Sequence, residues 1–150
     1  MKQIILGFLL LLFFSCKDQK ATEKQVQLFL EFVQETQLIQ EYLLEKTKEP
    51  SFEEIKKKLE QIQKESVGSP FSPIYNSVST LLKEKPDSEE KWSKLHSEMA
   101  EILYPGLKLT QNAKYHKFHC PMVDRSWIDA GVEVRNPHSK SMRDCGEMID

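Results

Sequence analysis

The stretch TEKQVQLFLEFVQETQLIQEYLLEK, residues 22–46, determines the class of fold. Its apolar side chains recur at the spacing of one helix face, at Val26, Phe29, Val33, Ile39 and Leu43. Neither glycine nor proline interrupts the run, and the intervening residues are mostly polar. The stretch therefore predicts one long amphipathic helix that needs partners to cover its apolar face.

Three further segments show the same periodicity, each bounded by glycine or proline: residues 51–67, 72–83 and 87–104. Ser51 and Asp87 are each followed by Glu three residues later, which is typical of a helix start. The sequence Tyr104-Pro105-Gly106 predicts the end of the fourth helix. Four amphipathic helices with short connections predict a mainly α fold, an up-down four-helix bundle.

Helical periodicity is lost after Pro105. The runs KYHKFHC (residues 114–120) and AGVEVRN (residues 130–136) alternate as strands do, and residues 129–131 read as a turn. We expect residues 107–150 to form a small β-hairpin or irregular cap on the bundle. The length suits one domain, which we place at residues 24–150.

The N-terminus resembles an export signal. Lys2 precedes the apolar run 4–14, which is too short to span a bilayer, and Ser15-Cys16 ends it before an abruptly polar stretch. This predicts a signal peptide over residues 1–15, lipidation of Cys16 and a tether over residues 16–23. The protein would then be a periplasmic or outer-surface lipoprotein, held on a membrane by its acyl chains.

Composition argues against two classes of function. The net charge is −2 and no basic stripe with interleaved aromatic residues occurs, so we expect no binding to nucleic acid. No serine elbow, H-E-x-x-H sequence or phosphate loop is present, and we predict that the protein is not an enzyme.

The C-terminal segment gathers soft metal donors. Cys120 and Met122 lie two residues apart, and Met142 and Cys145 lie three apart. If the cap brings these pairs together, they form a sulfur-rich site of the kind that Cu(I) prefers, with His116 or His119 completing it. Zinc is less favoured because no C-x-x-C pair is repeated.

A disulfide between Cys120 and Cys145 is the alternative use of the same cysteines. An exported protein resides in an oxidising space, and a cap without helical stripes gains from a covalent link. Closing a loop of this length contributes about 3 kcal/mol in the chain-entropy model. From the residues alone both uses stay open. Trp127 is predicted to be a packing anchor of the cap, and His96 a surface or edge residue.

The segments FHCPM, VEVRNP and SMRDCGEM resemble the C-terminal signature of the bacterial family known as domain of unknown function 3347. The family pattern is Cys-Pro-Met, a Trp, then Glu-Ile-x-Asn-Pro-Tyr-x-Gly, then Met-x-x-Cys-Gly. In this sequence 138–140 is His-Ser-Lys where the family has Tyr-x-Gly. The matched positions are Cys120, Pro121, Met122, Trp127, Glu133, Val134, Asn136, Pro137, Met142, Cys145 and Gly146.

Members of that family are exported, often as lipoproteins, and the domain also occurs on adaptor subunits of heavy-metal efflux systems. The resemblance implies a helical domain with a metal-associated cap, in which Cys120, Met122, Met142 and Cys145 are functional. Two hypotheses result. The first is a lipoprotein that binds Cu(I) for buffering or for transfer to an efflux or maturation partner. The alternative is a non-metal interaction or scaffold lipoprotein whose cap is stapled by a disulfide.

Overall fold

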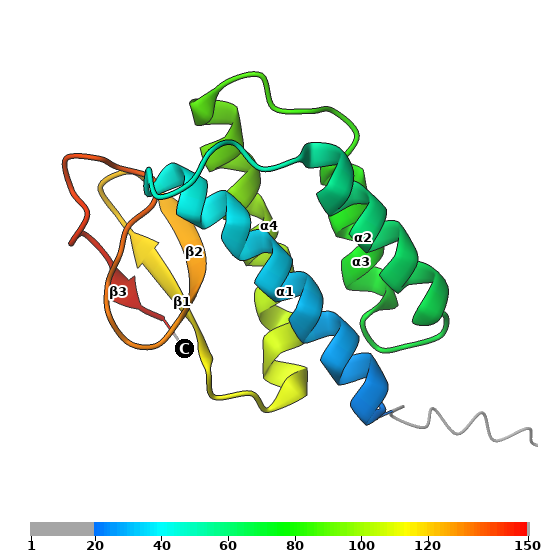
Figure 1. Ribbon diagram of the computed structural model, residues 1–150. Helices are drawn as coiled ribbons and strands as arrows, with labels where there is room; N and C mark the ends of the chain where they lie inside the picture. The colour runs from blue at the N-terminus through cyan, green and yellow to red at the C-terminus, as the bar shows by residue number, and fades with distance from the viewer. Residues whose placement is uncertain (1–19, 150) are drawn as a thin grey trace, which may run out of the picture.

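The computed structural model describes residues 20–149 and consists of four helices followed by a three-stranded antiparallel sheet (Figure 1). The helices are α1 (Glu23–Leu43), α2 (Phe52–Glu65), α3 (Ser72–Leu81) and α4 (Glu89–Thr110), and the strands are β1 (Tyr115–Cys120), β2 (Arg125–Ala130) and β3 (Glu147–Met148). The predicted signal peptide, Cys16 and most of the tether lie outside the described residues. No helix within residues 20–149 is both long and apolar enough to cross a membrane.

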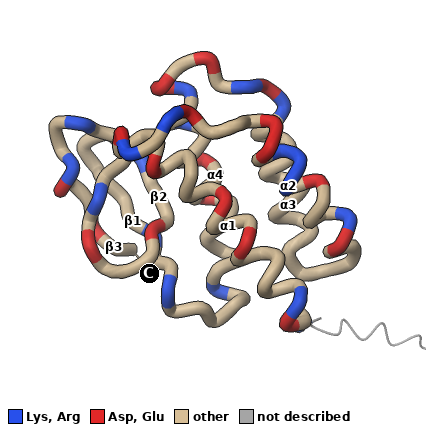
Figure 2. The backbone as a smooth tube through the Cα atoms, viewed as in Figure 1, with Lys and Arg blue, Asp and Glu red and all other residues tan. Residues whose placement is uncertain are grey.

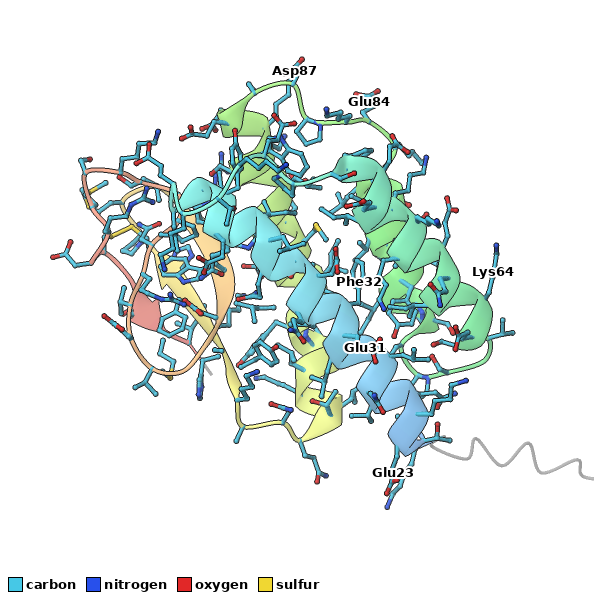
Figure 3. The ribbon with its side chains drawn as sticks, viewed as in Figure 1. Glu23, Glu31, Phe32, Lys64, Glu84 and Asp87 are labelled. Atoms are coloured by element: carbon cyan, nitrogen blue, oxygen red, sulfur yellow. A yellow bond between two sulfur atoms is a disulfide. The ribbon has the colours of Figure 1, made fainter. Side chains whose placement is uncertain are left out.

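The helices form the predicted bundle with a small C-terminal cap. Each helix packs against the next along the chain, and α1 also packs against α4, which closes the ring. Phe32 of α1 points into the space between the helices (Figure 3). The core contains a stacked pair, Phe29 and Phe71, whose ring centroids are 4.5 Å apart, and Trp92, which meets Phe52 edge to face at 6.2 Å.

Three of the helices begin at a residue with a side-chain hydroxyl group. This hydroxyl accepts a hydrogen bond from a backbone N–H of the first turn that has no partner within the helix. Thr22 forms a complete capping box with Gln25 at the start of α1. The Ser51 hydroxyl accepts from the backbone N–H of Glu54, as predicted. The predicted N-cap residue of α4, Asp87, was wrong by one position. The Ser88 hydroxyl accepts a hydrogen bond from the backbone N–H of Lys91, whereas the Asp87 carboxylate binds the Lys91 side chain.

The fourth helix does not end at Pro105 but continues to Thr110. Leu103 and Leu107, one turn apart on either side of the proline, are both buried in the core. A Cβ on Gly106 would collide with the ring of Phe29 and lie 2.7 Å from Ile74 Cδ1. Burial of this turn against α1 and α3 therefore outweighs the hydrogen bond that proline removes.

The hairpin is also shifted from its predicted place. The chain reverses at Pro121–Asp124, where Asp124 takes a positive φ of 49°, so that β2 is residues 125–130 and not 130–136. β2 lies against the bundle, with Ile128 in the main core and the backbone N–H of Ser126 donating to Ser97 Oγ at 2.9 Å. Contacts with α1 and α4 thus select the strand, and the alternating residues 132–136 lie in a loop.

The sheet has the order β2-β1-β3, with Cys120 opposite Arg125 and Phe118 opposite Trp127. One face of the hairpin packs on the helices, and Gln37 and Gln40 of α1 donate to Ile128 O and Asp129 Oδ2. The other face is covered by the C-terminal segment, which crosses back over the sheet to reach β3 (Figure 1).

Candidate functional site

The two cysteines of the cap are joined by a disulfide. Cys120 ends β1 and is fully buried, whereas Cys145 is half-buried in the turn before β3. Their Cα atoms are 5.6 Å apart across 25 residues of sequence. The backbone N–H of Cys145 donates to Met142 O at 3.1 Å, and that of Met142 faces Ser139 O at 3.4 Å. These consecutive turns hold Cys145 over the end of β1.

A second, smaller core lies beneath the disulfide. Phe118 and Trp127 stack with centroids 5.5 Å apart and planes 14° apart, and both are fully buried. Val123, Val134 and Cys145 pack around them. A Cβ on Gly146 would lie 2.5 Å from the Trp127 ring, which explains a glycine there. Trp127 is the packing anchor that the sequence predicted.

The predicted sulfur donors diverge at the turn. Because residues 121–124 form a turn and not an extended strand, Met122 does not share the orientation of Cys120, and its side chain is 73% exposed. Met142 is half-buried, one turn before Cys145. The structure therefore brings the two cysteine sulfurs together, keeps Met142 in the adjoining turn and leaves Met122 at the surface.

The two predicted histidine donors lie on opposite faces of β1. His116 shares the face of Phe118 and Cys120 by the two-residue repeat of a strand, and it is half-buried. His119 belongs to the other face, where its Nδ1 is 3.1 Å from Ser126 Oγ. His116 is thus on the cysteine side of the sheet, four residues away along the strand, and His119 is not.

The oxidation state of the two cysteines decides whether the cap residues can bind a soft metal ion. Within residues 20–149, no group of three or more His, Cys, Asp or Glu side chains is arranged to hold a metal ion. Methionine thioethers fall outside that set, and the cysteine sulfurs bond to each other. Thiolates are the ligands that Cu(I) favours. The cap residues therefore fit Cu(I) in the dithiol state, which two-electron reduction of the disulfide produces.

A buried histidine pair joins the cap to α4, and sequence reasoning missed it. His138 Nε2 is 3.1 Å from the carbonyl oxygen of Ser126, and its Nδ1 is 2.8 Å from Ser93 Oγ. A carbonyl only accepts, so Nε2 carries the proton and Nδ1 accepts from the serine hydroxyl. The ring of His96 lies 5.4 Å from that of His138, centroid to centroid.

His96 is 2% exposed, so its prediction as a surface or edge residue was wrong. It lies four residues after Trp92 and three before Met99, and this spacing was the signal for a buried position. Its Nδ1 has no hydrogen-bond partner within residues 20–149. Burial lowers the pKa of His138 to about 4 and holds the pKa of His96 well below its usual value, so both rings are neutral at pH 7.

Ser126, His119 and Asp124 are the residue types of a hydrolytic triad, but their geometry serves the hairpin. The Ser126 side chain is buried, at 3% exposure, so its hydroxyl cannot receive a substrate. His119 Nε2 is 3.9 Å from Asp124 Oδ1, beyond hydrogen-bond reach, and that carboxylate is 96% exposed. The set links β1 to β2 and does not activate a nucleophile.

Comparisons with known proteins identify no relative. No family model matches the chain, no curated protein matches it, and no solved structure matches it.

Proposed function

We propose that this protein is an exported, lipid-anchored protein that captures Cu(I) through Cys120 and Cys145 in their dithiol state. It buffers the ion or passes it to an efflux or maturation partner. We also propose that it is a divergent member of the domain of unknown function 3347 family. One observation carries the proposal. Cys120 and Cys145 are 25 positions apart in the sequence, yet the fold places their sulfur atoms within bonding distance, beside the turn that contains Met142.

Reduction would precede capture. A dithiol reductant supplies two electrons and two protons, the S–S bond breaks, and two thiols form while the reductant becomes a disulfide. The half-buried Cys145 is the sulfur open to attack, since Cys120 is fully buried. Loss of the thiol protons gives two adjacent thiolates for the ion, with Met142 or Met122 as thioether donors. Binding is therefore expected to weaken in acid.

An anaerobic Cu(I) titration against a competing chelator tests this function. The sample is the protein from residue 17 onward, reduced beforehand, and the comparison is Cys120→Ser with Cys145→Ser. We expect one ion per reduced chain, none in the double variant and none in the oxidised protein. Retention of tight binding by the double variant would exclude these cysteines as the site.

Methionine variants test the thioether donors in the same titration. Met142→Leu and Met122→Leu are each compared with Met148→Leu, a partly exposed methionine on β3 outside the proposed donor set. Loss of a donor is expected to weaken binding about tenfold, or 1.4 kcal/mol, and the Met148 control is expected to match the parent. Equal affinities in all three would leave the cysteines as the whole sulfur site.

The disulfide favours a second candidate, a non-metal interaction or scaffold lipoprotein. In this function the disulfide staples the cap over Phe118 and Trp127, and the helical bundle offers surfaces to a protein partner. Thiol counting distinguishes the two functions. Two results together would support the scaffold function. The disulfide would re-form completely after reduction and exposure to air, and the reduced protein would take up no Cu(I).

A further inference from the structure

One end of the bundle gathers three chain segments, of which the start of α1 carries Lys20, Glu23 and Lys24 and the other two are uncharged. They are the start of α1, the connection between α2 and α3, and the end of α4, and residues of all three line one hollow of roughly 670 Å³. Residues 66–82 and 109–113 contain no charged side chain, so both connections are uncharged here (Figure 2). We call this region the tether-end surface, defined by Ala21, Val26, Val67, Pro70, Leu109 and Thr110.

Two large apolar side chains project from the tether-end surface. Val67 is 82% exposed and Leu109 is 55% exposed, although the core nearby offers burial to Val26 and Leu107. They come from different connections: Leu109 lines the hollow, whereas Val67 precedes Gly68, which lines it. Exposed apolar side chains at one end of the bundle favour a surface that is covered in use.

The length of chain before α1 decides what covers it. Lys20, at the rim of the hollow, lies only four positions after Cys16. Four fully extended positions reach about 14 Å. If Cys16 carries acyl chains in a bilayer, the tether-end surface is the part of the domain that the tether holds against the lipid headgroups.

We propose that the tether-end surface rests on the phospholipid bilayer, with Val67 and Leu109 inserted at the headgroup boundary. The inference rests on the lipid anchor of the proposed function. Glu23 and Lys64 lie at this end and Asp87 at the opposite end (Figure 3). The ion pair of Arg125 with Glu90, at 2.8 Å, places the Cys120 end of the hairpin at the start of α4.

The consequence is an oriented domain. α4 has 22 residues, and at 1.5 Å per residue the helix spans about 33 Å from the bilayer side to the disulfide side. The Cys120–Cys145 pair would therefore face away from the membrane, where a soluble donor or acceptor of the metal ion reaches it.

Tryptophan quenching by brominated lipid tests the surface. Val67→Trp is compared with Leu38→Trp. Leu38 is an exposed apolar residue about 22 Å along α1 from the first residue of that helix, Glu23, and so lies away from the tether-end surface. The acylated full-length product is reconstituted into vesicles of zwitterionic and anionic phospholipid with brominated acyl chains. Trp92 and Trp127 are buried, so the parent emission is subtracted as background. Loss of roughly half of the added Val67→Trp emission, with the Leu38→Trp emission unchanged, is expected for insertion at the headgroup boundary.

Leu109→Trp is a second, independent reporter from another segment, and it is expected to be quenched as Val67→Trp is. Equal quenching of all three positions, or quenching of Leu38→Trp alone, would overturn the proposal. Intact mass before reconstitution separates the causes of failure. An acylated protein without selective quenching overturns the surface alone, whereas a chain without acyl groups at Cys16 overturns the anchor and the surface together. Cu(I) capture is decided by its own titration in either case.

Discussion

Asp129 is a buried carboxylate whose charge is balanced by one arginine. It is 2% exposed and accepts hydrogen bonds from Arg135 Nη2 at 2.6 Å and from Gln40 Nε2 at 2.7 Å. The hydrogen bonds to Asp129 raise the pKa of Arg135. Asp129 lies on β2 and Arg135 in the loop that follows it, so the pair forms only when this loop folds back on the strand.

Arg135→Met is expected to lower the free energy of unfolding by about 3 kcal/mol, because Asp129 stays buried without its partner. Arg125→Met is the matched control. It removes an ion pair whose carboxylate, Glu90, is 79% exposed, and its cost should stay within about 1 kcal/mol. Urea denaturation of both variants measures the difference. If both variants lost the same free energy of unfolding, the buried pair of Asp129 and Arg135 would be no more important for stability than an exposed pair.

His138 makes the attachment of the cap sensitive to acid. Its pKa is about 4 in the folded protein and about 6.5 when exposed, so between these values the unfolded chain binds the proton and the folded chain does not. Stability is therefore full above pH 6.5 and falls as the pH drops toward 4, by up to about 3 kcal/mol from this residue. Below pH 4 both states are protonated and its contribution no longer changes.

Urea denaturation at pH 7 and pH 5 measures this effect in the parent and in His138→Gln. The glutamine variant retains a donor and an acceptor but does not titrate, so its stability should depend less on pH. His96, whose pKa is also lowered by burial, contributes in the same direction in both proteins. An identical pH dependence in parent and variant would mean that His138 is protonated without cost in the folded protein.

Among the elements, α4 departs furthest from what local sequence predicts. A proline followed by a glycine ends most helices, yet α4 passes through both because Leu103 and Leu107 are buried and Gly106 admits the ring of Phe29. The substitution Gly106→Ala distinguishes the effect of helix propensity from the effect of side-chain packing. Alanine favours an exposed helix by about 1 kcal/mol, but here its Cβ meets Phe29 and Ile74, and we expect a net loss of about 1–2 kcal/mol.

The double variant Phe29→Leu with Gly106→Ala is the control, because the smaller side chain makes room for the added methyl group. Its destabilisation should be less than the sum of the two single variants, as measured by thermal or urea unfolding. Additive effects would show that the contact with Phe29 does not limit this position.

For the molecule as a whole, the disulfide is a local staple on a bundle that has its own core. Cys120→Ala with Cys145→Ala is expected to lower the free energy of unfolding by about 3 kcal/mol through loop entropy. Apart from Ile128, the main core lies outside the 120–145 loop, so far-UV circular dichroism at 25 °C should keep its helical signal. Near-UV signals from the Phe118–Trp127 stack should weaken. Collapse of the helical signal would make the cap essential to the bundle.

Much of the bundle could be predicted because its information is local. The starts of α1 and α2 follow from Thr22 and Ser51, and the core positions Phe29, Val33 and Leu43 follow from the 3.6-residue repeat of one helix face. Part of the candidate site was also readable, since Trp127 was predicted as a packing anchor and occupies the second core.

What depends on contacts between distant segments could not be read in this way. Val132 and Val134 alternate as well as β2 does, yet β2 is the strand because Ile128 finds burial against α1 and α4. Met122 points to water because Asp124 closes the turn, and His96 meets His138 only once the cap has docked. Periodicity specifies which residues share a face. Which face is buried, and against what, depends on the free energy of packing surfaces that are brought together only by the folded chain.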